Sequence, residues 1–324
     1  MQPGAEELLP YRVGGLMYTP AITKGVAEKL RTKSYPCLMT MALCLEDSIA
    51  DDALEEAERQ LKATLTEIAQ TVAEEDRPLL FARIRTPEHM ARVHALLGDA
   101  RGVLTGYILP KFDLSNADDY IQVLRRINEG GERPWYIMPT LESGAVADTV
   151  TRAAALMQIR EKIDSVRPWV LNVRVGGNDF SNLFGLRRSV RQTIYDIGVI
   201  RDVLVDILNV FSRDYVVSGP VWEYFGTDAD GDWARGLRRE IEMDLINGFI
   251  GKTAIHPTQL PVIHEALKVT RADFDDAQAI LGWNRVGFAV AKSADGSRMN
   301  EVKCHTRWAR RIDCRGRIYG IVEE

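Results

Sequence analysis

The chain has 324 residues and a formal net charge of −5, with 46% hydrophobic and 27% charged residues. This length is enough to bury a large core, either in one barrel-sized domain or in two smaller ones. Both signs of charge are mixed along the chain, which argues against nucleic acid or an anionic membrane as the main partner. The N-terminus lacks the basic and apolar regions of a signal peptide, and no apolar run has membrane-spanning length, so we expect a cytoplasmic protein.

Short apolar runs alternate with amphipathic segments along the first 254 residues. We predict strands over 15–20, 37–45, 79–84 and 106–109, in the runs that begin at Trp135 and Val170, and over 215–218 and 249–254. Helices are predicted over 22–33 and 53–75, from Pro87, and over 116–129, 146–164, 189–211 and 232–247. The four cysteines form no Cys-x-x-Cys pair, which indicates buried free thiols in a reducing compartment.

Eight strands that alternate with helices over roughly 250 residues predict an α/β fold of the (β/α)8 TIM-barrel type. A doubly wound open sheet is the alternative, but no Gly-x-Gly-x-x-Gly motif follows the first strand. After Gln259 the pattern changes to two helices, near 271–281 and 304–318, joined by a polar stretch over 292–300. We therefore predict a barrel domain over residues 1–268 and a C-terminal helical appendage over 269–324.

Two acidic residues follow neighbouring strands of the predicted barrel. Glu142 ends the run that begins at Trp135, and Asp179 ends the run that begins at Val170. Parallel strands end at the same edge, so the two carboxylates are expected side by side, where they repel each other unless a cation or a shared proton intervenes. A hard divalent ion fits, because it needs few protein oxygens and keeps open positions. The alternative is that each acid caps a helix or faces solvent.

Other polar residues fall at the same predicted rim. Glu46 and Asp47 follow the second strand, Arg83 ends the third, Lys111 follows the fourth, and His256 follows the eighth. Barrel enzymes keep their active sites at the carboxyl ends of the strands. The fold prediction therefore supports the metal site.

Six short motifs occur in the order of a known family. They are Leu45-Glu46-Asp47-Ser48, Ala82-Arg83-Ile84, Leu109-Pro110-Lys111, Thr140-Leu141-Glu142-Ser143, Gly176-Gly177-Asn178-Asp179 and Gly251-Lys252-Thr253-Ala254-Ile255-His256-Pro257. Over about residues 13–265 the chain resembles the citrate lyase β-subunit-like group of the HpcH/HpaI aldolase superfamily. The resemblance implies a Mg²⁺-dependent carbon–carbon lyase or aldolase that acts on a short hydroxy- or oxo-acid, or its CoA thioester, through an enolate.

The resemblance also implies residue roles. Glu142 and Asp179 are the implied metal ligands, Arg83 binds a carbonyl or carboxylate oxygen, and Glu46 and Asp47 hold metal-bound water. The chemistry agrees, because an enolate needs positive charge placed in advance, and a guanidinium and a metal supply it.

Further substrate contacts are expected at the backbone of Gly176, Gly177 and Asn178, where glycines allow close approach. Lys111 is a substrate-binding candidate or forms an ion pair at the rim. The alternative for Arg83 is an ion pair with Glu46.

Two departures from the family pattern concern the substrate. Leu43 or Cys44 stands where many members have a first acid, and Arg85 replaces an asparagine, which adds positive charge near the expected substrate. The usual substrates of the family are therefore in doubt. A non-catalytic barrel that binds a metabolite or a protein remains the alternative function, and an acyl-CoA thioesterase is a third.

In relatives the tail packs on a neighbouring subunit and brings an acid over the active site. The corresponding stretch here is Gly296-Ser297-Arg298-Met299-Asn300-Glu301. We expect a homo-oligomer, a trimer or a hexamer, in which the tail closes as a lid and Glu301 or Asp295 transfers a proton. The alternative is a tail folded on its own barrel.

Overall fold

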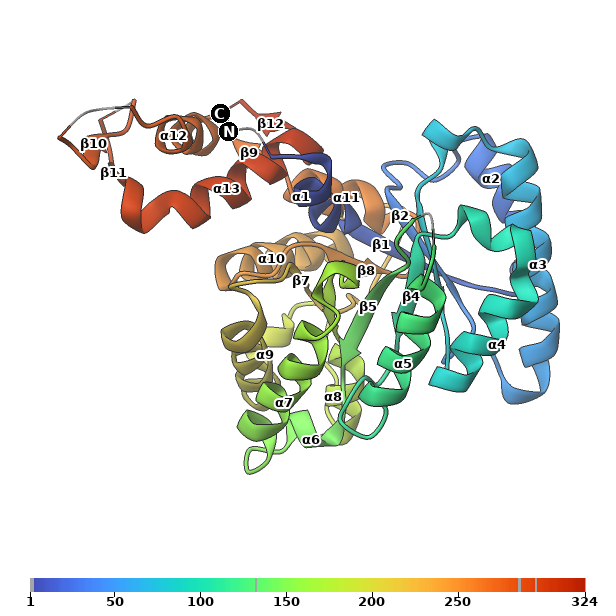
Figure 1. Cartoon of the computed structure of the whole chain (residues 1–324). Coiled ribbons are helices and arrows are strands. Elements are labelled where there is room, and N and C mark those ends of the chain that lie inside the picture. The colour runs from blue at the N-terminus through green and yellow to red at the C-terminus, as the bar shows by residue number, and fades with distance from the viewer. Residues whose placement is uncertain (1–2, 132, 285–286, 295, 324) are drawn as a thin grey trace. The chain divides into compact units, whose positions relative to one another are not determined.

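The computed structural model describes residues 3–131, 133–284, 287–294 and 296–323 (Figure 1). Its internal contacts divide the chain into two compact units, Val13–Ile263 and a second unit made of Met1–Arg12 with His264–Glu324. The boundary thus lies near the predicted end of the barrel, and the first residues of the chain join the C-terminal unit. No described helix combines the length and apolar character needed to cross a membrane.

The larger unit is built on eight parallel strands. They are β1 (Gly15–Pro20), β2 (Thr40–Cys44), β3 (Leu79–Arg83), β4 (Gly106–Leu109), β5 (Tyr136–Leu141), β6 (Val173–Val175), β7 (Val217–Ser218) and β8 (Lys252–Ala254). Neighbouring strands pair in chain order from β1 to β7, and β8 pairs with β1. A parallel bridge between Gly219 and Lys252 joins the two ends of the sheet. The sheet is therefore closed, and the predicted (β/α)8 barrel is confirmed.

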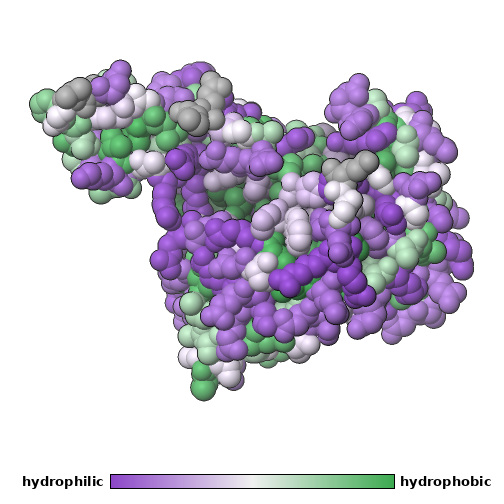
Figure 2. All heavy atoms as spheres, in the orientation of Figure 1, coloured by the Kyte–Doolittle hydropathy of each residue, from purple (hydrophilic) through white to green (hydrophobic). Residues whose placement is uncertain are grey.

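Helices follow the strands and pack outside them. They are α2 (Val26–Arg31), α3 (Leu54–Thr71), α4 (Pro87–Leu97), α5 (Ala117–Asn128), α6 (Gly144–Ala147), α7 (Arg152–Asp164), α8 (Gly177–Leu183), α9 (Gly198–Phe211), α10 (Asp232–Asn247) and α11 (Gln259–Ala266). In α3, Leu61, Leu65 and Ile68 are fully buried at helical spacing, so one side of the helix faces the strands. Hydrophilic residues cover most of the barrel face visible in Figure 2.

Two predicted helices are interrupted in the structure. The segment predicted over 146–164 forms α6 and α7 with a break between them, and Val150 in this break is 91% exposed. In the segment predicted over 189–211, the α-helix begins only at Gly198. A short 3-10 helix at Ile194–Asp196 precedes it, and Thr193 and Asp196 form a capping box at its start. Helices α8 and α11 were not predicted.

The smaller unit holds two helices, α12 (Arg271–Leu281) and α13 (Val302–Tyr319), with the short α1 (Ala5–Leu8). The helix predicted over 271–281 has those bounds. Strand β9 (Val269–Thr270) pairs with β12 (Ile321–Val322). The core of the smaller unit is formed by apolar residues of both helices and of β9, namely Val269, Ala277, Ile280, Ala309 and Ile312. Strands β10 (Val290–Lys292) and β11 (Met299–Glu301) pair as an antiparallel ribbon.

Candidate active site

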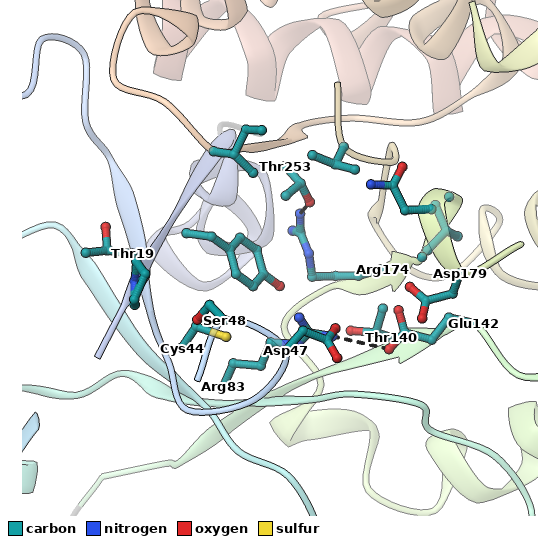
Figure 3. A pocket seen from close by; sticks show the side chains of 18 residues that line it. Thr19, Cys44, Asp47, Ser48, Arg83, Thr140, Glu142, Arg174, Asp179 and Thr253 are labelled. Carbon is teal, nitrogen blue, oxygen red and sulfur yellow. Dashed lines mark hydrogen bonds and ion pairs between the residues drawn. The ribbon is translucent and has the colours of Figure 1, made fainter. Parts of the chain in front are cut away.

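A pocket of about 400 Å³ opens at the carboxyl ends of the barrel strands. Its walls come from the ends of β1, β2, β3, β5, β6 and β8 and from the loops that follow them. Three acids from the sequence motifs, Asp47, Glu142 and Asp179, line the pocket together with Arg83 (Figure 3). Residues far apart in the sequence meet here because parallel strands end at one edge.

Arg83 is surrounded by carboxylates. Its Nη2 atom lies 2.9 Å from Glu46, 3.2 Å from Asp47 and 3.4 Å from Glu142, and its side chain is 11% exposed. Burial alone would lower its pKa, but Tyr18, Glu142 and Glu46 raise the pKa above its ordinary value. The ion pair with Glu46 is therefore present, yet the Nε atom of Arg83 is buried without a partner. The guanidinium is fixed in position and keeps a donor free.

Glu142 is a buried carboxylate at the floor of this pocket. Burial raises its pKa from 4.5 to about 8; the nearby Arg83 opposes this rise, and the charge of Asp179 adds to it. The backbone N–H of Lys111 donates to Glu142 Oε1 at 2.8 Å, and Lys111 adopts a positive φ of 48° to do so. A non-glycine residue in this conformation marks strain that surrounding structure maintains. The protein thus holds Glu142 rigidly beside a second acid.

Gly176 leaves room for that carboxylate. A Cβ atom at position 176 would lie 2.0 Å from Glu142 Oε2 and 2.4 Å from Glu142 Cβ. Contacts this short do not occur in proteins, so any side chain at this position would displace Glu142. The glycine is needed here for space, since its φ of −96° suits any residue.

We expect Gly176→Ala to weaken Mg²⁺ binding by at least about tenfold, because it would displace the ligand Glu142. Loss of a group that only supports a metal ligand already lowers metal affinity by about this factor. Gly144→Ala is the matched control, because a Cβ at Gly144, two residues from Glu142, meets no atom within 4 Å. Isothermal titration with Mg²⁺ measures both variants. Equal affinities for the two would show that the packing of Glu142 on Gly176 is irrelevant to the metal.

Lys111 contacts acids with its side chain as well as with its backbone. Its Nζ atom lies 2.7 Å from Glu46 and 3.3 Å from Asp47. The hydrogen bond that Lys111 donates to Glu46 is the main cause that raises the pKa of Lys111, although the side chain is about half exposed. Lys111, Arg83 and the two acids after β2 therefore form one charged cluster at the rim, so the ion pair considered for Lys111 is present.

The structure also places the remaining predicted residues. Gly177 and Asn178 line the pocket with Gly176, and Asp179 lies in the first turn of α8 and not on a loop. Glu301 lies in the smaller unit on β11, where its backbone N–H donates to His305. Asp295 lies outside the described residues.

Arg85 does not have the position near the substrate that the sequence predicted. Its guanidinium donates to the carbonyl oxygens of Leu45 and Ile49 and pairs with Asp51, so it fastens the loop after β2. It does not line the pocket among the residues that the structure describes. The positive charge that was expected near the substrate instead holds the loop after β2 in place.

Other pocket residues escaped prediction. Tyr18, Thr140, Arg174 and Thr253 all line the pocket from strands β1, β5, β6 and β8. Their signal in the sequence was weak, because Tyr18 and the two threonines fit any strand. Arg174 could have been found, since it is the one charged residue inside the apolar run Val-Leu-Asn-Val-Arg-Val.

The donor set suits a hard cation with few protein ligands. Among the described residues no group of three or more His, Cys, Asp and Glu side chains is placed to hold a metal. Two carboxylates are nevertheless what Mg²⁺ commonly takes from a protein, with waters and substrate in the other positions. Burial first and then the charge of Asp179 raise the pKa of Glu142, and a cation bound between the two acids would offset both effects.

A family model described as the C–C bond lyase of the TIM-barrel fold matches residues 7–321. The chain therefore belongs to this family of carbon–carbon lyases. No curated protein matches the chain in sequence.

Several solved structures share the fold of this chain. The protein CitE of Mycobacterium tuberculosis, in complex with magnesium, acetoacetate and coenzyme A, has 21% identity and a TM-score of 0.58, covering 94% of this chain and 98% of its own. A citrate lyase of Burkholderia xenovorans has 16% identity and a TM-score of 0.68, covering 96% and 93%. RipC of Yersinia pestis has 18% identity and a TM-score of 0.56, covering 82% and 99%.

Proposed function

We propose that the chain is a Mg²⁺-dependent lyase or aldolase that makes or breaks a carbon–carbon bond in a short hydroxy- or oxo-acid or its CoA thioester. The observation that carries the proposal is the pair of carboxylates, Glu142 and Asp179, held beside the guanidinium of Arg83 in one pocket. Similar proteins bind magnesium with acetoacetate and coenzyme A, or with oxaloacetate, which supports both the metal and the class of substrate.

In this proposal Glu142 and Asp179 hold the ion, which supplies positive charge next to the reacting carbonyl group. Breaking the bond leaves an enolate, and the planar fork of Arg83 stabilises its oxygen. Backbone N–H groups of Gly177 and Asn178 bind a carboxylate of the substrate, whereas the N–H of Gly176 already donates to the carbonyl oxygen of Leu141. Glu46 and Asp47 orient water at the rim, and Lys111 steadies both acids through its ion pairs.

The test is a thermal-unfolding screen of short hydroxy-acids, oxo-acids and acyl-CoA thioesters, each measured with Mg²⁺ and with a chelator. A ligand that binds the native state raises the unfolding temperature by mass action. The proposal expects shifts that require Mg²⁺, followed by turnover of the same compounds. Absence of Mg²⁺ binding in calorimetry would rule it out.

The smaller unit is assigned to oligomerisation in the same proposal. We infer a homo-oligomer, a trimer or a hexamer, in which the tail of one subunit brings Glu301 to the active site of another. Asn300 and Arg298 bind Asp276 at 2.6 and 2.5 Å, so the ribbon that carries Glu301 is fixed to α12. None of the four cysteines, Cys37, Cys44, Cys304 and Cys314, forms a disulfide, which supports a cytoplasmic location. Only Cys44 and Cys314 are buried, so the prediction of buried thiols is wrong for Cys37 and Cys304, which are exposed.

Removing residues 1–12 together with 269–324 is expected to abolish turnover and dissociate the oligomer. Both segments must go, because Tyr319 donates to the carbonyl of Tyr11 within the smaller unit. Light scattering measures the assembly, and calorimetry checks that residues 13–268 still bind Mg²⁺. Glu301→Gln in the full chain is the matched variant, which should lose turnover and keep the assembly. An oligomer that survives the truncation contradicts the role of the tail.

A further inference from the structure

Arg174 is a buried cation inside the barrel. It lies at the centre of β6, is 2% exposed and lines the pocket. Its Nη2 atom donates to Thr253 Oγ1 at 2.6 Å (Figure 3). Its side chain also forms a hydrogen bond with Tyr18. Its Nη1 atom is buried and has no hydrogen-bond partner. Both partners are neutral hydroxyl groups, so nothing in these contacts balances the charge.

The other buried lysine and arginine side chains of the described residues are paired. Arg152 lies 2.9 Å from Asp206, Arg188 lies 3.2 Å from Glu240, and Lys252 lies 2.7 Å from both Glu240 and Asp244. Burying a charge costs several kcal/mol unless an opposite charge compensates it. Arg174 is the exception to this pairing among the residues that the structure describes.

The charges around Arg174 do not supply a counter-ion. Burial lowers its pKa, Tyr18 opposes this effect, and the nearby Arg83 lowers the pKa further. Glu142 is close enough to act in the opposite direction, but it already accepts from Arg83 and from the backbone of Lys111. Arginine stays protonated in proteins, so the positive charge remains in the pocket.

The interior of a TIM barrel is normally filled by branched apolar side chains. An unpaired guanidinium at such a position costs stability, and costs of this kind are typical of functional sites. The hydroxyl groups of Thr19 and Thr140, both 5% exposed and lining the same pocket, also lack partners. Several unsatisfied polar groups therefore surround one cavity, where a bound anion would satisfy them.

We propose that Arg174 is a specificity-determining residue that pairs with a second negative group of the substrate. This inference rests on the proposed function, in which the first anionic group lies beside Glu142 and Asp179. A substrate with a single carboxylate leaves Arg174 unpaired.

The first test compares the binding of oxaloacetate and 2-oxoglutarate with that of pyruvate, by calorimetry at saturating Mg²⁺. The wild type is expected to bind at least one dicarboxylate about 10- to 100-fold more tightly than pyruvate, which is the usual effect of a hydrogen-bonded charge pair. Arg174→Gln should remove this preference, because it lowers the affinity for the dicarboxylates more than the affinity for pyruvate. Arg174→Lys should keep part of it, since the charge remains and the fork is lost.

The second test uses the metal-free protein and does not depend on the reaction. Arg174→Met removes an unpaired buried charge, so its unfolding temperature should equal or exceed that of the wild type. Arg152→Met is the matched control, because Arg152 is also buried but is paired with Asp206 and donates to the carbonyls of Val146 and Ala147. Its loss should lower the unfolding temperature by about 4 °C or more.

The outcomes separate this inference from the proposed function. A wild type that binds no Mg²⁺ defeats the proposed function, whatever the Arg174 variants do. A wild type that binds Mg²⁺ but shows no preference for either dicarboxylate overturns the role of Arg174, and so does a preference that survives in Arg174→Gln. A large loss of stability in Arg174→Met, similar to that of Arg152→Met, would assign Arg174 to the scaffold instead.

Discussion

Arg83→Lys is expected to lower the turnover rate by about 100-fold or more, although it keeps the positive charge. The Nη2 atom of Arg83 is held by Glu46 and Asp47, while its Nε atom is buried and has no partner. A lysine ammonium is a point charge that the same acids would draw away from the substrate. The loss should therefore appear in kcat and not only in KM, because the contact with an enolate oxygen exists mainly in the transition state.

Arg85→Lys is the matched control for this variant. Arg85 lies two residues away, and its guanidinium holds the loop after β2 through Leu45, Ile49 and Asp51. Arg85→Lys should mainly lower the unfolding temperature and change the turnover rate little. Arg83→Lys should mainly lower the turnover rate and change the unfolding temperature little. Steady-state kinetics and thermal unfolding of both variants give the comparison. Nearly full activity in Arg83→Lys would reduce Arg83 to a structural ion pair.

The positions of the charged rim residues could be predicted from the sequence for a simple physical reason. Once the strands are recognised, their carboxyl ends must meet, and an acid just after a strand can lie only at that edge. Glu142, Asp179 and Arg83 were found in this way, without any measured distance. The prediction did not depend on the helices, which is why the interruption between α6 and α7 left it intact.

Side-chain direction was beyond the same reasoning. Arg83 and Arg85 belong to one short motif, yet one lines the pocket and the other fastens a loop. The alternation of a strand places successive side chains on opposite sides, but the sequence does not say where the strand stops. The backbone N–H of Lys111 that holds Glu142 was equally hidden, because its positive φ depends on packing around the loop.

Glu142→Gln is expected to weaken Mg²⁺ binding by at least about tenfold while it preserves the fold of the pocket. The amide keeps the shape of the carboxylate but cannot be ionised. In the wild type, a proton competes with the ion below the pKa of about 8, so Mg²⁺ affinity should rise with pH by up to about tenfold per unit until that value is reached. Mg²⁺ binding at pH 7 should therefore release a proton, which calorimetry in two buffers of different ionisation enthalpy detects.

The same substitution makes an opposite prediction for the metal-free protein. Because the folded pKa of Glu142 is raised from 4.5 to about 8, its contribution to stability is fully present below about pH 4.5 and is lost as pH rises through 8. The variant has no such group, so its unfolding temperature should match that of the wild type near pH 5 and exceed it near pH 8 when metal is absent. Added Mg²⁺ should reverse the order at pH 8, since only the wild type can use the charge to bind it. An order of stabilities that stays the same with and without Mg²⁺ at pH 8 would place the ion elsewhere in the protein.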